Sequence, residues 1–251
     1  MGPMPRETGI LGPGGASFPD TPWSSILAHT RGEATLSTGT VERLARLYWR
    51  PVYFWFRYRW RRPSEDSKDL TQDLFTSLLS RETAAPLDPA RGRLRVYLKA
   101  VADNLVRHRA RDARRLKRGG GRPVVELGAV DESSFVAPHD EAACESQYDA
   151  EWSKCIVDRG LETLVERLRL SGKEAYADLL RFHDLAPGAP PSYEECARRF
   201  RLTVDQVRNH LRYARSLLRG IVREVVAQSL ADPADADGEY ARLFGRGATH
   251  A

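Results

Sequence analysis

Apolar residues recur at intervals of three and four over most of this chain, and this pattern predicts amphipathic helices. The predicted helices begin near Pro22, at Ser64 and near Leu94, and helical spacing returns from Glu151 onward. Residues 123–150 show no such period and are expected to be irregular. The expected fold class is therefore all-α, with two small helical domains on either side of an irregular, acidic linker.

The helix predicted over residues 64–80 has two different faces. One is an apolar stripe, and the other carries carboxylates spaced by three and four residues, Asp66, Asp69 and Asp73, with Gln72 beside them. A solvated surface helix is one interpretation of this pattern. The other is a face with a functional role. The pattern alone favours the solvated face, and the strongly basic sequence about twenty residues downstream shifts the balance toward a role.

Eight aromatic residues crowd into positions 48–60, inside a long helix expected to start at an N-cap Thr40 and to end near Trp60. Arginines alternate with them, so one interpretation is a stacking platform for single-stranded bases. The other is the core of a helical domain whose arginine side chains reach outward, and we favour it. Pro51 lies inside this helix and marks the place where a kink is expected.

Two consecutive capping boxes, Ser192 with Glu195 and Thr203 with Gln206, predict two short helices joined by a tight turn at residues 201–202. This arrangement is a helix-turn-helix. The outward face of its second helix carries Arg208, Asn209, Arg212 and Tyr213, with Arg215 near them. Arg and Asn side chains suit two-bond recognition of guanine and adenine edges. A surface helix of a bundle is the alternative, but caps, turn and basic face together favour DNA binding.

Charge is sorted along the chain more sharply than the net value of +5 suggests. Residues 91–122 hold twelve Lys or Arg against two acids, whereas residues 123–151 hold eight acids and no Lys or Arg. Such segregation indicates separate partners or separate tasks for the two stretches. The basic helix that begins near Leu94 could be solvated, lie on a membrane or bind phosphates. The membrane interpretation lacks a broad apolar face over residues 107–118.

Composition excludes several other classes of protein. The mean hydropathy is −0.49, and no apolar run is long enough for a membrane helix or resembles a signal peptide. The three cysteines are widely spaced, which indicates neither a zinc site nor a disulfide framework and fits a reducing cytoplasm. The sequence shows no phosphate loop, HExxH motif or nucleophile elbow, so we expect no catalysis, metal or cofactor.

Three stretches of the chain resemble bacterial RNA polymerase sigma factors of the extracytoplasmic-function type, within the sigma-70 family. EDSKDLTQDLF, residues 65–75, is similar to the region 2 helix that docks on the polymerase clamp. GRLRVYLKAVADNLVRHRARDARR, residues 92–115, is similar to the helix that melts and reads the minus-10 element. SYEECARRFRLTVDQVRNHLRYARSLLR, residues 192–219, is similar to region 4, whose helix-turn-helix reads the minus-35 element.

The resemblance implies a role for each group of candidate residues. The residues that would meet basic groups on the polymerase clamp are Asp66, Asp69, Gln72 and Asp73. Asn104 would lie near the flipped minus-10 base, and the opening duplex would be held by Arg107, His108, Arg111 and Arg115. The minus-35 major groove would be met by Arg208, Asn209, Arg212, Tyr213 and Arg215.

The resemblance also divides the chain into parts. These are a disordered tail (1–22), a region 2-like domain (23–120), an acidic linker (121–150), a region 4-like domain (151–228) and a C-terminal extension (229–251). The linker would thread polymerase channels or serve as a solvated tether. The extension is expected to be a tail or a partner helix. One departure from the family is Arg201, which stands where the turn glycine is usual; a positive φ there would cost roughly 1 kcal/mol.

The expected function is that of a transcription initiation factor, which binds core RNA polymerase and directs it to promoter DNA. An anti-sigma factor or another regulator would be a further partner, and the sequence identifies none. The alternative is a free-standing helix-turn-helix regulator that binds DNA without polymerase.

Overall fold

The computed structural model describes residues 22–79, 92–112, 135 and 137–245, and within these ranges the chain is all-α, as predicted. The helices are α1 (Pro22–Thr30), α2 (Thr38–Phe54), the π-helix η1 (Trp55–Arg59), α3 (Ser64–Ser77), α4 (Leu94–Asp112), α5 (Glu141–Leu170), α6 (Glu174–Asp184), α7 (Tyr193–Phe200), α8 (Val204–Ala227), the 3-10 turn η5 (Pro233–Asp235) and α9 (Ala236–Phe244). None of the helices in these ranges has an apolar stretch long enough to cross a bilayer.

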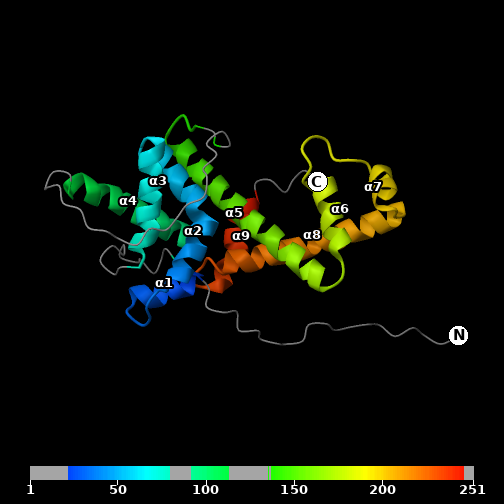
Figure 1. Cartoon of the computed structure of the whole chain (residues 1–251), viewed down its shortest axis with the longest axis horizontal. Helices are drawn as coiled ribbons and strands as arrows, with labels where there is room; N and C mark the ends of the chain where they lie inside the picture. Colours follow the sequence, from blue (N-terminus) through cyan, green and yellow to red (C-terminus); the bar gives the residue numbers. More distant parts are fainter. Residues whose placement is uncertain (1–21, 80–91, 113–134, 136, 246–251) are drawn as a thin grey trace.

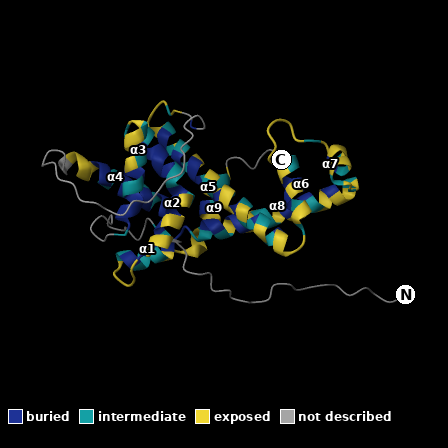
Figure 2. Ribbon diagram, in the orientation of Figure 1, coloured by how far each residue is buried: buried dark blue, intermediate teal, exposed yellow. Residues whose placement is uncertain are grey.

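Two groups of helices lie at opposite ends of an elongated molecule, and the long helix α5 runs from one to the other (Figure 1). At one end α2 packs against α1, α3, α4 and the first part of α5. At the other end α6 and α7 pack against α8. Helix α9 returns to the middle, where it contacts α5 and α8. Buried residues, dark blue in Figure 2, occur along the helices of both groups and belong to one hydrophobic cluster.

The aromatic cluster of residues 48–60 is core, which confirms the interpretation we favoured. Five of its members are at most 6% exposed, namely Tyr48, Tyr53, Phe54, Trp55 and Phe56. Tyr48 stacks on Trp152 of α5 with ring centroids 4.3 Å apart and an interplanar angle of 8°. Offset aromatic pairs of this kind add to the free energy of burial, so this contact secures α5 on α2.

The start of α2 differs from the sequence prediction, whereas Pro51 lies inside the helix as expected. The N-cap is Ser37, whose Oγ accepts a hydrogen bond from the Thr40 N–H at 3.2 Å, so Thr40 is already the third helical residue. Pro51 lies inside α2 without ending it, and the helix widens into the π-turn η1 just beyond. The Trp60 N–H closes that turn on the carbonyl oxygen of Trp55 at 3.3 Å.

The expectation of an irregular linker over residues 121–150 is wrong for residues 141–150, which form the first part of α5. Asp140 caps this helix, since its Oδ1 accepts from the Ala143 N–H at 2.7 Å. Residues 121–134 lie outside the described residues. The boundary expected at residue 151 therefore falls inside a continuous helix.

The sequence pattern missed this part of α5 because only a few of its residues are apolar and buried. Cys144, Tyr148 and Trp152 follow one another at intervals of four, and all three are buried. The acids between them meet cations of α4, with Glu145 on Lys99 and Asp149 on Arg95. Their charge is thus neutralised by contacts that no local pattern reveals.

The helix-turn-helix forms as predicted from its caps. Ser192 accepts from the Glu195 N–H at 3.2 Å and donates its own N–H to the Glu195 carboxylate at 2.7 Å. Thr203 and Gln206 make the same pair of bonds at 3.2 and 2.8 Å. Arg201 ends α7 in the left-handed conformation, with φ 55° and ψ 46°, so the tight turn is formed without a glycine.

Candidate nucleic-acid and protein interfaces

The outward face of α8 presents polar side chains to solvent. Arg208, Asn209 and Arg212 are all exposed. The Arg212 Nη2 donates to the Asn209 Oδ1 at 2.9 Å, and Arg208 lies 3.4 Å from Asp205. Both contacts are exposed and join residues one turn apart, so they orient the side chains at small energetic cost. This face can therefore meet the donors and acceptors of base edges.

Tyr213 adds an aromatic group to this face and is 43% exposed. Its ring meets Tyr176 of α6 edge-on, with centroids 5.7 Å apart, and the Lys173 Nζ lies 4.4 Å from its centroid. Lys173 and Tyr176 escaped the sequence analysis because they belong to another helix and carry no motif. They widen the basic face beyond α8 itself.

His210 lies under this face and stacks on Tyr176 with centroids 3.9 Å apart. Burial lowers the pKa of His210, which favours the neutral imidazole. The charge of this part of the surface therefore comes from arginine and lysine side chains.

Arg215 differs from its neighbours, because its guanidinium is already engaged. It donates two hydrogen bonds to Asp184 at the end of α6, at 2.7 and 2.6 Å, in the planar geometry that favours bidentate pairs. Burial acts to raise the pKa of Asp184, but the hydrogen bonds from Arg215 and His183 outweigh it and hold that pKa below its ordinary value. Arg215 thus ties α8 to α6, a role that the sequence analysis did not anticipate.

The basic helix α4 is anchored by an acid beside the predicted minus-10 residue. Asp103 accepts hydrogen bonds from the indole N–H groups of Trp55 and Trp60, both at 2.8 Å. Asn104 follows it and is half-buried, whereas Arg107 and His108 are exposed on the next turn. The side chains of Arg111 and Arg115 lie outside the described part of the structure.

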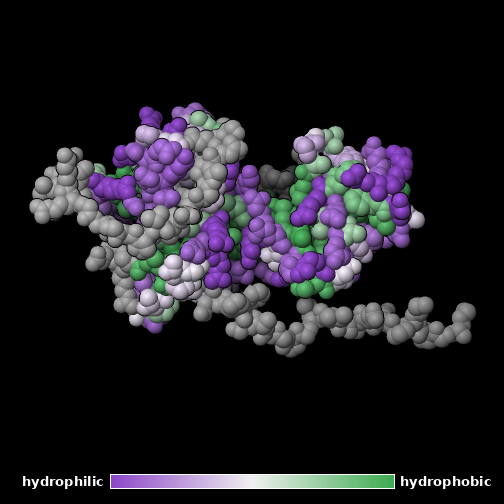
Figure 3. Space-filling view, viewed as in Figure 1, coloured by the Kyte–Doolittle hydropathy of each residue, from purple (hydrophilic) through white to green (hydrophobic). Residues whose placement is uncertain are grey.

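The acidic face of α3 lies on the surface and not in the core. Asp66 and Asp69 are exposed, and Gln72 and Asp73 are half-buried. Asp73 forms an ion pair with Arg109 of α4, a residue that the sequence analysis did not single out. The structure therefore brings the acidic face of α3 and the basic end of α4 together. Figure 3 shows hydrophilic surface over α3 at one end of the molecule and around α7 at the other.

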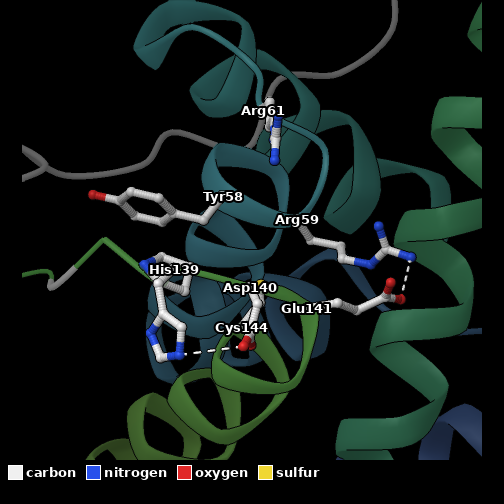
Figure 4. A pocket seen from close by; sticks show the side chains of 8 residues that line it. Tyr58, Arg59, Arg61, His139, Asp140, Glu141 and Cys144 are labelled. Carbon is white, nitrogen blue, oxygen red and sulfur yellow. Dashed lines mark hydrogen bonds and ion pairs between the residues drawn. The ribbon is translucent and has the colours of Figure 1, made fainter.

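A small cavity of about 160 Å³ lies where η1 meets the start of α5 (Figure 4). Two contacts join lining residues, Arg59 with Glu141 at 2.6 Å and His139 with Asp140 at 3.2 Å, and Arg61 also lines the cavity. Cys144 lies at its base, and burial raises the pKa of this thiol to about 11. The thiol is therefore expected to be neutral and unreactive at physiological pH.

These elements define an all-α protein with a capped helix-turn-helix at one end and an acidic helix beside a basic helix at the other. Comparison with protein-family models, with curated proteins and with solved structures gives no match.

Proposed function

We propose that this protein is a promoter-specificity factor that binds core RNA polymerase and directs it to DNA, without catalysis of its own. The observation that carries the proposal is that one folded chain exposes three surfaces of different charge. They are the acidic face of α3, the basic end of α4 and the outward face of α8. The resemblance of their sequences to sigma regions 2 and 4 gives each surface its partner.

The resemblance gives individual residues their proposed roles. Asp66 and Asp69 meet basic groups of the polymerase, and Gln72 and Asp73 border that contact. Arg107 and His108 contact the phosphates of the minus-10 DNA, with Asn104 nearer the bases. At the minus-35 element the groove is met by Arg208, Asn209, Arg212 and Tyr213.

The proposal is tested by run-off transcription with purified bacterial core polymerase on fragmented DNA of the source genome. We expect discrete transcripts only when the protein is added, since a specificity factor converts non-specific binding into promoter choice. An unchanged transcript pattern with and without the protein would contradict the proposal.

The second candidate function is a helix-turn-helix regulator that binds DNA without polymerase, and it is favoured by the completeness of the α7–α8 motif. Reversing the charge of the two exposed acids, Asp66→Lys with Asp69→Lys, separates the two functions. Loss of polymerase pull-down with DNA binding retained supports the specificity factor. Glu42→Lys, an equally exposed acid on α2, is the matched control and should retain both activities.

A further inference from the structure

A lysine beside the outward face of α8 comes from a different part of the chain. Lys173 is the N-cap of α6, and its backbone N–H donates to the Leu168 carbonyl oxygen of α5 at 2.8 Å. Its Nζ lies 4.4 Å from the centroid of the Tyr213 ring on α8. The turn between α5 and α6 therefore holds a positive charge at the edge of the surface that carries the candidate groove residues.

Three aromatic side chains, which we call the aromatic platform, lie under this lysine. They are His210 and Tyr213 of α8 and Tyr176 of α6. The imidazole of His210 stacks on Tyr176 with centroids 3.9 Å apart and an interplanar angle of 18°. Tyr176 in turn meets the Tyr213 ring edge-on, at 5.7 Å and 88°. Because these rings already hold one another in place, little side-chain freedom is left to lose when a ligand binds beside them.

The charge of Lys173 is matched by rings and not by a carboxylate. Among its neighbours, Arg169 lies 2.9 Å from Glu166, and Arg215 lies 2.6 Å from Asp184. Within the described ranges Lys173 has no such ion pair, and its ammonium lies near the Tyr213 and Tyr176 rings, 5.9 Å from the latter centroid. A cation–π contact leaves the net charge in place, so the ammonium can still donate to an anion.

The place of Lys173 beside α8 indicates which anion it meets when α8 binds DNA. A helix with its side chains is about 10–12 Å across, and the major groove is about 12 Å wide, so a helix in the groove fills it. A cation next to the reading face, but on a neighbouring helix, then lies against the wall of the groove. That wall is made of phosphate and sugar.

We propose that Lys173, together with the hydroxyl group of Tyr213, binds one backbone phosphate at the edge of the groove that α8 enters. Tyr176 is then a positioning residue, because it holds the Tyr213 ring and lies under the ammonium. The inference rests on the proposed function only in that α8 meets DNA, and it applies equally to a regulator that works without polymerase. A phosphate contact adds affinity and fixes the register of α8, whereas it carries no base sequence information.

The salt dependence of DNA binding tests this contact, since it counts the phosphates that protein cations neutralise. Fluorescence anisotropy is measured between about 50 and 200 mM salt, with the full chain alone and with core polymerase. The two labelled duplexes are one enriched by the wild type from a random library and a scrambled version of it. Lys173→Gln should reduce the slope of log K against log salt by about 0.9 and weaken binding about five- to tenfold near 0.1 M salt, equally on both duplexes.

Three further variants separate charge from position. Lys173→Arg keeps the charge and should keep the slope. Lys154→Gln removes the same charge from an exposed position on α5, before that helix reaches α8, and is the matched control with an unchanged slope. An unchanged slope in Lys173→Gln, or a loss confined to the enriched duplex, would overturn the phosphate contact.

The positioning role of Tyr176 has its own readout. Tyr176→Ala should lose as much of the salt slope as Lys173→Gln, although it removes no charge, and Tyr176→Phe keeps the ring and should bind like the wild type. Circular dichroism checks that both variants keep their helices, since a folded protein with an ordinary slope in Tyr176→Ala would overturn this role.

The outcome for the contact is independent of the outcome for the proposed function. A reduced slope in Lys173→Gln, without any transcript in the run-off assay, would support the contact and contradict the promoter-specificity factor. A normal slope in Lys173→Gln with discrete transcripts would do the reverse. Absence of DNA binding by the wild type, both alone and with core polymerase, would overturn both.

Discussion

At the scale of single residues, two nearby arginines on α8 have different hydrogen-bond partners. Arg212 is exposed and donates a hydrogen bond to Asn209 on its own helix, whereas Arg215 donates to Asp184 of α6. The sequence places both on the same basic face, because position on a helix is all that a local pattern records. Whether a guanidinium meets DNA or a carboxylate of the same chain depends on what the neighbouring helix offers.

Arg212→Ala should weaken binding to the preferred DNA sequence by about 1–3 kcal/mol and relax specificity at the base pair it reads. Arg219→Ala removes an exposed arginine from the same helix further from its N-terminus and is the control. Competition binding with preferred and scrambled duplexes measures both. Equal losses on the two duplexes for Arg212→Ala would contradict base recognition.

The Asp184–Arg215 pair should make stability depend on acid pH. The folded pKa of Asp184 lies below the ordinary value of about 3.9 expected in the unfolded chain, so its contribution to stability is present above that pH and is lost as the pH falls below it. Asp184→Asn should therefore be less stable at pH 7 and should lose less stability on acidification than the wild type.

This effect is measured as the free energy of unfolding in urea, determined for the wild type and for Asp184→Asn between pH 7 and pH 3. Asp178→Asn, which removes an exposed acid 3.8 Å from Arg181, should follow the wild-type pH profile. Parallel profiles for Asp184→Asn and the wild type would show that the pair contributes nothing.

At the scale of elements, α5 organises the molecule because it packs along its whole length. Its first part stacks on α2 through Trp152, and its second part packs on α8 at Gly160. A side chain at residue 160 would push the two helices apart, so glycine serves here for close approach and not for a turn.

Gly160→Leu should lower the free energy of unfolding by about 1–3 kcal/mol, because added atoms overpack a buried contact. Gly220→Ala is the matched substitution at an exposed helical glycine with nothing within 4 Å, and it should raise the free energy of unfolding by about 0.5–1 kcal/mol. Thermal or urea unfolding compares the two. Stabilisation by Gly160→Leu would contradict the close approach of α5 and α8.

At the scale of the whole molecule, one continuous set of buried side chains extends from α1 to the end of α8. The two predicted domains therefore share helix α5, one hydrophobic core and the contacts that α9 makes with α5 and α8. Folding units that share so much buried surface are expected to unfold together.

Urea unfolding should accordingly follow a single transition. All five tryptophans lie between residues 23 and 152, so their fluorescence reports mainly on one end of the molecule, while far-ultraviolet ellipticity reports on all the helices. The two signals should give the same midpoint. Separate midpoints would show that the helix-turn-helix end unfolds on its own and that the shared core is not cooperative.

The sequence by itself determined the all-α class and both capping boxes of the helix-turn-helix, and it favoured the core role of the aromatic cluster. These features depend on contacts three or four residues apart or on simple burial of apolar side chains, and both leave a local pattern. The tertiary structure decided that residues 141–150 are helical, that Asp73 meets Arg109, and that Glu239 meets Arg95 across 144 positions of chain. A charged residue looks the same in the sequence whether it is solvated or paired with a residue far along the chain. Only the folded chain could therefore distinguish an exposed charge from an ion pair that joins two helices.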